Sequence, residues 1–432
     1  MFPLSHMLQS FVRVGSLTII DADGRRHVFS GAPGPVVTAR LTDRSLYYKL
    51  ILNPGLYAGE AYMDGGVVLE ENSTLRDFLA LFSLNRSSLS SYPLQKIVRS
   101  VRRALKRFQQ ANPIGRAQKN VAHHYDIGND FYKLFLDRSM QYSCAYFQSD
   151  GDSLEQAQQN KLRLIAAKLE LRPGLKVLDI GSGWGNLALY LAALADVDVT
   201  GVTLSKEQHT LANEMAERAG LADRVRFELR DYREIDGRFD RIVSVGMFEH
   251  VGVPHYGEFF AKVNALLADD GIMLLHSIGH MRPPGVSSPW LRKYIFPGAY
   301  APALSEVFAA TEKAGLWVTD LEVLRLHYAR TLREWGRRFE ANRAKVAVIY
   351  DERFCRMWEL YLVSAEMMFD SGSQHVFQMQ LTRQLDAAPI VRDYMTDLQR
   401  RYRMLEKEPG VGSLEPVPSW NAREPARNTL PS

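Results

Sequence analysis

A strand, a glycine-rich loop and a helix follow one another from Val177 to Leu191, and this unit restricts the possible folds more than any other part of the chain. Its loop reads VLDIGSGWG and is followed by the apolar segment NLALY. Gly181 and Gly183 let the backbone approach a ligand closely, because glycine has no side chain and adopts backbone angles that other residues avoid. The unit therefore predicts an α/β fold with a nucleotide-like ligand at the end of its first strand.

Apolar strands alternate with helices after this unit. We expect strands at 176–180, 198–204, 224–230, 239–245, 271–278, 317–326 and 375–381, and helices between several of the first five at 186–195, 206–219 and 257–268. Such alternation is typical of a parallel sheet with helices on both faces. Two insertions, a Pro-rich aromatic stretch at 281–303 and a long helical region at 331–369, follow late strands, whose carboxyl ends border the ligand crevice in such sheets.

A small α+β domain is predicted before the sheet, over residues 1–93. Segments such as GSLTIIDADGRRHVF and VVTARLT alternate apolar and polar residues around the turns DADG and GAPGP, which predicts short antiparallel strands. The segment STLRDFLALFSL then predicts a helix capped by Ser73 or Thr74. These residues leave both lipid binding and partner binding open as the role of the domain.

A basic segment at 94–121 links this domain to the rest of the chain. It carries eight Lys and Arg residues and no Asp or Glu, with apolar residues at helical spacing, so we predict a basic amphipathic helix. Such a helix is either a solvated connection or a contact with an anionic membrane surface. Nucleic acid is not an expected partner, because no run of aromatic residues accompanies the basic ones. The main domain is expected over 122–405, with a disordered tail at 406–432.

The composition argues against a membrane-spanning or disulfide-based protein. No apolar run approaches the roughly 18 residues of a transmembrane helix, and the first residues lack the pattern of a secretory signal. Cys144 and Cys355 are the only cysteines, and they are not spaced as metal ligands. We therefore expect a cytoplasmic protein without a metal site.

The glycine loop can be compared with a dinucleotide site. NAD-binding folds place their third Gly or Ala later in the loop, and an acidic residue about 20 residues further on. Here Gly185 is followed directly by Asn186, and the second strand ends GVTLS without an acid. Asp179, before the first glycine, and the later pair Asp231-Tyr232 fit S-adenosylmethionine better. The structural alternative is a tight turn between strand and helix that binds no ligand.

Eight segments, in order along the chain, resemble one enzyme family. They are HYDIGNDFY, QYSCAYF, VLDIGSGWGNLALY, GVTLSKEQ, FDRIVSVGMFEHVG, LLHSIG, YIFPG and HYARTL, and the resemblance runs from about residue 122 to residue 381. They closely resemble segments of cyclopropane-fatty-acyl-phospholipid synthases, relatives of the mycolic acid cyclopropane synthases. The resemblance implies a Rossmann-like class I methyltransferase fold with a mostly parallel seven-stranded sheet, helical insertions and a small N-terminal α+β domain.

The resemblance also implies which residues surround S-adenosylmethionine. They are Tyr142, Ser143, Gly181, Gly183, Gly185, Thr203, Leu204, Gln208, Asp231 and Tyr232, to which the position before the first glycine adds Asp179. By the same resemblance, Gln208 takes the place of the ribose-binding acid that the second strand lacks.

The chemistry of the family then predicts the reaction. The implied enzyme transfers a methylene group from S-adenosylmethionine to the cis double bond of an unsaturated phospholipid acyl chain, which forms a cyclopropane ring. A base must remove a proton from the new methyl group, and in the family this base is a bound bicarbonate. The residues that match its site here are Cys144, Glu249, His276, Ile278 through its backbone, and Tyr328.

Each of these residues also has a structural interpretation. His276 lies in the apolar strand LLHSI and Cys144 could be a small buried hydrophobe, so the assignment depends on the occurrence of the whole set. A carboxylate amid apolar residues, as at Glu249, is costly unless it has a partner. Many family members carry cysteine where this sequence has Ala365, so a mechanism that needs a thiol at that position is excluded.

The predicted substrate places the enzyme at a membrane. Unsaturated phospholipid chains lie in the bilayer, so we expect peripheral docking at the inner face of the membrane. The expected docking and channel elements are the basic helix and the aromatic stretches PWLRKYIFPGAY and FCRMWELYL. The family often forms homodimers, although the sequence indicates no interface. Two alternatives stay open: a fatty-acyl methyltransferase that gives a methyl-branched or methylene product, and a lipid-binding protein with a silenced catalytic domain.

Overall fold

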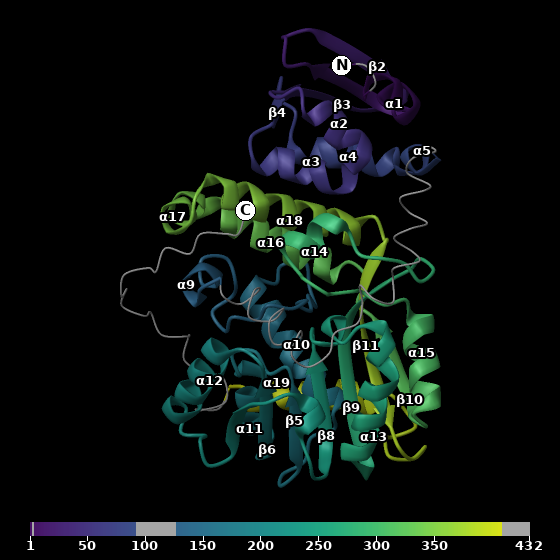
Figure 1. The fold of residues 1–432 in the computed structure, drawn as a ribbon. Coiled ribbons are helices and arrows are strands. Elements are labelled where there is room, and N and C mark those ends of the chain that lie inside the picture. The colour runs from purple at the N-terminus through teal and green to yellow at the C-terminus, as the bar shows by residue number, and fades with distance from the viewer. Residues whose placement is uncertain (2–3, 92–126, 408–432) are drawn as a thin grey trace.

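The computed structural model of the chain describes residue 1 and residues 4–91 and 127–407. Two sheets lie at opposite ends of the molecule, the smaller one near the N-terminus, with a layer of helices between them (Figure 1). The basic helix predicted at 94–121 lies outside the described residues, as does all of the predicted tail after its first two residues.

The larger sheet has seven strands in the order β10-β11-β9-β8-β5-β6-β7. Their bounds are β5 (Lys176–Ile180), β6 (Asp198–Thr203), β7 (Val225–Leu229), β8 (Phe239–Val245), β9 (Leu267–His280), β10 (Trp317–Val323) and β11 (Gln374–Thr382). The strands from β9 to β7 pair in parallel, whereas β11 runs antiparallel to both of its neighbours. The mostly parallel seven-stranded sheet predicted from the sequence is therefore confirmed.

Helices cover both faces of this sheet. They are α10 (Leu154–Lys168), α11 (Asn186–Ala195), α12 (Lys206–Arg218), α13 (Tyr256–Leu266), α15 (Leu304–Lys313) and α19 (Asp393–Leu405). Val177 and Leu178, adjacent on β5, belong to different apolar clusters, because successive strand residues face opposite sides. The cluster of Val177 includes residues of α10, α11, α12 and α19, and that of Leu178 includes residues of α13 and α15. Ser153 and Ser205 begin α10 and α12 by accepting a backbone N–H of the first turn.

The second insertion consists of three helices. They are α16 (His327–Ala341), α17 (Arg343–Ile349) and α18 (Glu352–Asp370). The predicted helical region at 331–369 is thus interrupted twice, and the side chain of Asp351 caps α18. The first helix also begins earlier than predicted, so Tyr328 lies in its first turn instead of in a connection after a strand.

The smaller sheet has four strands in the order β2-β1-β3-β4. Its elements are α1 (Leu4–Phe11), β1 (Val14–Ile20), β2 (Arg26–Ser30), β3 (Ala32–Leu41), α2 (Leu46–Leu52), α3 (Pro54–Met63), β4 (Val67–Glu70), α4 (Leu75–Leu84) and α5 (Arg86–Ser91). Of the two predicted helix caps, Thr74 caps α4, in a capping box with Asp77.

The prediction of antiparallel pairing is wrong for one pair of these strands, because β1 and β3 run parallel. Between β2 and β3 the chain crosses over the start of β1, where the Gly31 N–H donates to the Gly15 carbonyl at 2.9 Å. A Cβ at Gly31 would lie 2.1 Å from the carbonyl oxygen of Arg13. Only glycine permits so close a crossing. The segment GAPGP, interpreted from the sequence as a turn, is this crossing.

The N-terminal residues pack on the helices inserted after the late strands (Figure 1). Trp290, on α14 (Pro289–Tyr294), is 5% exposed, and its indole N–H donates to the Met63 sulfur at 3.2 Å. A Cβ at Gly59 of α3 would lie 2.4 Å from the indole ring. Arg76 of α4 also forms an ion pair with Glu366 of α18. The aromatic stretch that the sequence assigned to membrane docking therefore places Trp290 against the N-terminal residues.

The start of the predicted tail is firmly held. Glu406 accepts a hydrogen bond from the Tyr190 hydroxyl at 2.6 Å and forms an ion pair with Arg163 of α10. The side chain of Arg163 is 2% exposed and that of Glu406 is 9% exposed. The prediction of a disordered tail from residue 406 onward is therefore wrong for Glu406.

Candidate active site

The glycine loop after β5 owes its shape to three residues with left-handed backbone angles. The φ values of Gly181, Gly183 and Gly185 are 84°, 56° and 86°. A Cβ at Gly185 would lie 2.6 Å from the ring of Phe227, and one at Gly181 would lie 2.8 Å from the Met247 side chain. Gly183 has no neighbour within 4 Å of such a Cβ. The outer two glycines thus serve close packing, while Gly183 leaves open space beside the loop.

A cavity, partly open to solvent, lies beside this loop. Its lining residues are Met140, Gln141, Tyr142, Ser143, Lys161, Ile165, Asp179, Gly181, Ser182, Gly183, Trp184, Asn186, Leu187, Gln208, Val245 and Gly246. Six of the predicted cofactor residues are among them, whereas Gly185, Thr203, Leu204, Asp231 and Tyr232 are not.

Several buried polar atoms of this cavity have no hydrogen-bond partner among the described residues. They are Asp179 Oδ2, Ser182 Oγ and Asn186 Nδ2. Burial also raises the pKa of Asp179 to about 7. Because buried polar groups in proteins are nearly always hydrogen-bonded, this set fits a polar ligand that supplies the missing partners. Both donors and acceptors are present, as the amino acid and nucleoside parts of S-adenosylmethionine require.

Gln208 is positioned by the end of β6. The Thr203 hydroxyl donates to Gln208 Oε1 at 3.0 Å, and Ser205 caps the helix that carries Gln208. Thr203 therefore does not line the cavity itself, but it holds the side chain of Gln208, which does. Leu204, next to it, is half-buried.

The pair after β7 is engaged elsewhere in this structure. Arg233 donates to both carboxylate oxygens of Asp231, at 2.8 and 2.7 Å. The ring of Tyr232 meets Phe259 edge-on at 5.4 Å between centroids. A direct cofactor contact by either residue therefore stays a prediction.

Lys161 is the main cavity residue that sequence reasoning missed. It lies on α10, is 0% exposed, and donates to Gln141 Oε1 at 2.6 Å and Ser143 Oγ at 2.9 Å. Burial lowers its pKa to about 8. The signal for this lysine was weak, because it stands among other polar residues in QAQQNKLRL. Only the fold reveals that its side chain points inward.

A second group of predicted residues lies at the carboxyl edge of the sheet. The Ile278 N–H donates to Glu249 Oε1 at 2.6 Å, and Glu249 Oε2 is buried without a hydrogen-bond partner in residues 4–91 and 127–407. His276, two residues before Ile278 on β9, pairs with Val245 in the sheet. Its ring Nδ1 is 3.2 Å from the Gln378 amide. Since Val245 lines the cavity, His276 adjoins the predicted cofactor site.

Burial shifts the pKa of both ionisable groups of this edge in the direction that favours their neutral forms. It raises the pKa of Glu249 to about 7 and lowers that of His276 to about 3. At neutral pH His276 is therefore neutral, and Glu249 is partly protonated. Such a pair can donate and accept hydrogen bonds without a fixed charge.

The segment that carries Cys144 lies against α16, the helix that carries Tyr328. Cys144 is 1% exposed, and the next residue, Ala145, donates its N–H to the Thr331 hydroxyl at 3.1 Å. Thr331 is one turn after Tyr328. Burial raises the pKa of the Cys144 thiol well above its usual range, so this cysteine is a neutral group and not a thiolate nucleophile.

Aromatic side chains surround Tyr142, next to the cavity. Its ring stacks on Trp335 at 5.2 Å, and its hydroxyl lies 3.0 Å from that of Tyr361. Trp358 and Tyr132 extend the same cluster. The stretch FCRMWELYL, predicted as a channel element, contributes Trp358 and Tyr361 to it. The cluster offers an apolar, largely buried surface next to the polar cavity.

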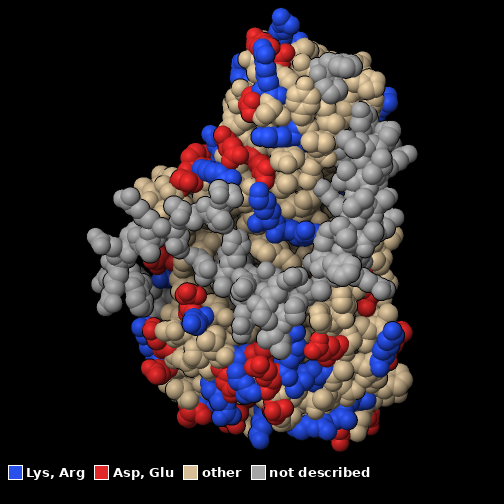
Figure 2. Space-filling model, in the orientation of Figure 1, with Lys and Arg blue, Asp and Glu red and all other residues tan. Residues whose placement is uncertain are grey.

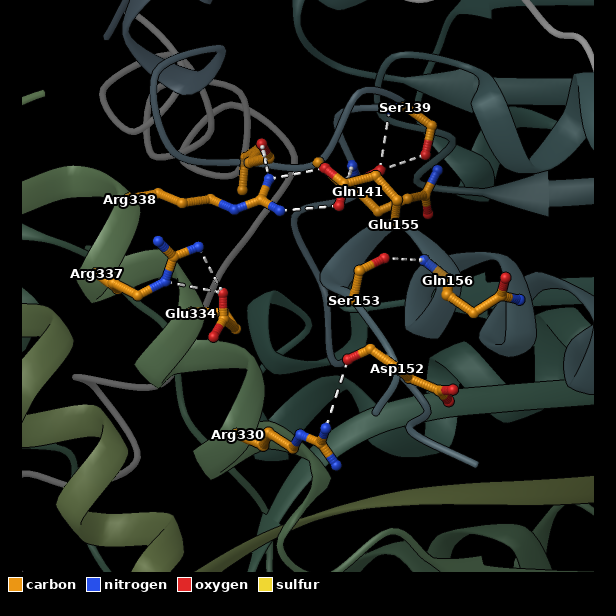
Figure 3. A network of polar contacts seen from close by, with 12 residues as sticks. Ser139, Gln141, Asp152, Ser153, Glu155, Gln156, Arg330, Glu334, Arg337 and Arg338 are labelled. Carbon is orange, nitrogen blue, oxygen red and sulfur yellow. Dashed lines mark hydrogen bonds and ion pairs between the residues drawn. The ribbon is translucent and has the colours of Figure 1, made fainter. Parts of the chain in front are cut away.

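Arginines of α16 bind the first turn of α10 and the residues just before it (Figure 3). Arg338 donates to both carboxylate oxygens of Glu155, at 2.9 and 2.8 Å, and Arg330 donates to the Asp152 carbonyl at 3.4 Å. The inserted helices and the cavity wall are therefore held as one unit.

Comparisons with known proteins agree with this geometry. A family model described as mycolic acid cyclopropane synthetase matches residues 114–379. The cyclopropane-fatty-acyl-phospholipid synthase of Escherichia coli K12 is 40% identical over 338 residues, which cover 78% of this chain and 86% of that protein. The tuberculostearic acid methyltransferase UfaA1 of Mycobacterium tuberculosis is 38% identical over 62% of this chain and 66% of its own.

A solved structure with a bound nucleoside product is also similar. Mycolic acid cyclopropane synthase CmaA1, complexed with SAH and CTAB, superimposes with a TM-score of 0.59 at 34% identity. The match covers 63% of this chain and 99% of that chain.

Proposed function

The chain belongs to the mycolic acid cyclopropane synthetase family. On this premise we propose that it transfers a methylene group from S-adenosylmethionine to the cis double bond of an unsaturated phospholipid acyl chain. The product of this reaction is a cyclopropane ring in the acyl chain. The chain is an S-adenosylmethionine-dependent methyltransferase, as the fold and the relatives agree. The observation that carries the proposal is the buried pair Glu249 and His276 at the sheet edge that adjoins the cavity.

Positioning accounts for much of the catalysis that these residues can provide. S-adenosylmethionine supplies an electrophilic methyl group on a sulfonium, and Asp179, Ser182, Asn186 and Gln208 would hold it. An alkene is a poor nucleophile, so the acyl chain must be held in line with that methyl group. The aromatic cluster around Tyr142 provides the apolar surface for such a chain and keeps water away.

We propose that bicarbonate is the base, held by Cys144, Glu249, His276, Ile278 and Tyr328. The raised pKa of Glu249 supports this assignment, because a protonated Glu249 donates a hydrogen bond to an anion that an ionised one would repel. When bound, bicarbonate supplies a base that removes the proton from the new methyl group. The Ile278 N–H binds Glu249 in this structure, which gives Ile278 the role of orienting that carboxyl group.

We propose that the enzyme works from the cytoplasm at the membrane surface, because its substrate chains lie in the bilayer. Within the described ranges no helix is long and apolar enough to cross a membrane. On the face drawn in Figure 2, acidic and basic side chains alternate over the larger sheet, so no broad basic surface marks that region. The basic segment at 94–121 is the favoured contact. We also retain the division into residues 1–93, 94–121 and 122–405, and a homodimer, as proposals.

The second candidate is an open-chain methyl transfer. It is favoured by the similarity to a tuberculostearic acid methyltransferase. A methyl-branched product keeps all three hydrogens of the new methyl group, whereas ring closure, like formation of an exocyclic methylene, removes one of them. The complete set of Cys144, Glu249, His276, Ile278 and Tyr328 favours loss of this proton and therefore argues against the methyl-branched product. A pure lipid carrier is less consistent with the unpartnered polar atoms of the cavity.

The test is a vesicle assay with purified protein. Vesicles of monounsaturated phospholipid are incubated with S-adenosylmethionine, in buffer with bicarbonate and in carbon dioxide-free buffer. We expect cyclopropane acyl chains by proton NMR, with a clear loss of rate when bicarbonate is removed. Open-chain methylated products alone would overturn ring formation, and an unchanged rate without bicarbonate would overturn its role as the base.

A further inference from the structure

Helix α10 carries three buried cations, and they differ in their partners. Arg163 pairs with Glu406, and Lys168 lies 2.5 Å from Glu322 and 3.6 Å from Asp320. Lys161 is equally buried, yet in the part of the chain that the structure describes no carboxylate oxygen lies within 4 Å of its Nζ. Its two hydrogen bonds go to the neutral side chains of Gln141 and Ser143.

Such a charge is costly unless something compensates it. A buried ammonium without a counter-ion loses its hydration and gains little from neutral acceptors. The lowered pKa of Lys161, caused by burial, reflects this cost. Asp137, the nearby acid, instead accepts three hydrogen bonds, from the backbone N–H groups of Ser139 and Gln141 and from the Ser139 hydroxyl.

A buried carboxylate lies in the same cavity and also lacks a partner for one oxygen. Asp179 lines the cavity together with Lys161, and its Oδ2 makes no hydrogen bond to any residue that the structure describes. The two side chains influence each other's charge but form no ion pair in the described residues. The cavity thus contains one positive and one negative group held apart.

A ligand that carries both charges satisfies both groups at once. The α-amino acid part of S-adenosylmethionine carries one ammonium and one carboxylate on the same carbon. Resting on the proposed function, we infer that Lys161 binds the carboxylate of the cofactor's amino acid part, opposite Asp179, which binds its ammonium. Lys161 then fixes the position of the neighbouring sulfonium, and it also fixes the loop through Gln141 and Ser143.

The experiment compares two ligands that differ in the carboxylate alone. They are S-adenosylhomocysteine and its decarboxylated analogue, which keeps the thioether, the nucleoside and the amine. Dissociation constants are measured by calorimetry for the wild type, Lys161→Met, Lys161→Arg and Lys168→Met. Lys168→Met is the matched control, because it removes a buried lysine from the same helix whose ion-pair partners, Glu322 and Asp320, do not line the cavity.

We expect the wild type to prefer S-adenosylhomocysteine at least about tenfold, which corresponds to about 1.4 kcal/mol. Lys161→Met should bind it at least about tenfold more weakly and lose the preference, while Lys161→Arg should keep part of it. Lys168→Met should lower stability and leave the preference intact.

Three results would overturn the inference: a wild type without the preference, a Lys161→Met protein that keeps it, or a Lys168→Met protein that loses it equally. The wild-type measurement alone can refute the inference, so the inference can be tested even if Lys161→Met does not fold. A wild type that binds neither ligand would instead refute the proposed function itself.

Discussion

Replacing Glu249 by glutamine should stabilise the protein at alkaline pH while it removes activity. Burial raises the pKa of Glu249 from 4.5 to about 7. A carboxyl group with a raised pKa stabilises the folded state below its unfolded pKa, and this advantage is lost as the pH rises through 4.5 to 7. At pH 8 the ionised group therefore costs about 3 kcal/mol, since each tenfold change in proton affinity is worth about 1.4 kcal/mol. Glutamine keeps the acceptor for the Ile278 N–H and carries no charge.

The assay is urea unfolding of the wild type and Glu249→Gln in carbon dioxide-free buffers at pH 5 and pH 8. We expect the variant to exceed the wild type by up to about 3 kcal/mol at pH 8, and by less than about 1 kcal/mol at pH 5. Turnover on vesicles should fall strongly, with the affinity for S-adenosylhomocysteine nearly unchanged. A variant no more stable than the wild type at pH 8 would refute the buried-carboxylate reasoning. Equal losses of turnover and cofactor affinity would refute the role of Glu249 in holding the base.

Three further changes test the packing around the site. Gly185→Ala places a Cβ 2.6 Å from an aromatic ring and should lower the free energy of unfolding by at least about 2 kcal/mol, as measured by denaturation. Gly183→Ala, whose Cβ has no described neighbour within 4 Å, should lower it by about half of that or less. Glu406→Ala removes the ion-pair partner of the buried guanidinium of Arg163 and should lower the free energy of unfolding by about 3 to 5 kcal/mol. The control Lys407→Ala, at the exposed neighbouring position, should change the free energy of unfolding by less than about 0.5 kcal/mol. Trp290→Ala should cost about 3 to 5 kcal/mol and make the N-terminal residues easier to cleave by limited proteolysis; unchanged cleavage would argue against this contact as the main anchor.

The sequence was sufficient for the large sheet because its strands are buried on both faces. The strand predicted at FDRIVSV, for example, matches the observed strand β8 residue for residue. The helix after the glycine loop was likewise predicted with its observed bounds, 186–195. Local signals of this kind need no knowledge of distant contacts.

Other features depended on contacts between distant segments. The parallel pairing of β1 and β3 results from a glycine crossing that looks like a turn in the sequence. The burial of Lys161 depends on the loop at 141–143, and that of Trp290 on Gly59 and Met63. No periodicity reports such long-range contacts, which is why these residues were missed or misinterpreted.

The most direct test of ring formation uses S-adenosylmethionine with a fully deuterated methyl group. The enzyme is incubated with this cofactor and vesicles of monounsaturated phospholipid, and the released acyl chains are analysed by mass spectrometry and NMR. If the base removes its proton from the new methyl group, the added carbon keeps two of its three deuterium atoms. We predict a cyclopropane carbon with two deuterium atoms. An open-chain product would contradict ring closure, whether it is a methyl branch that retains all three deuterium atoms or an exocyclic methylene group that retains two.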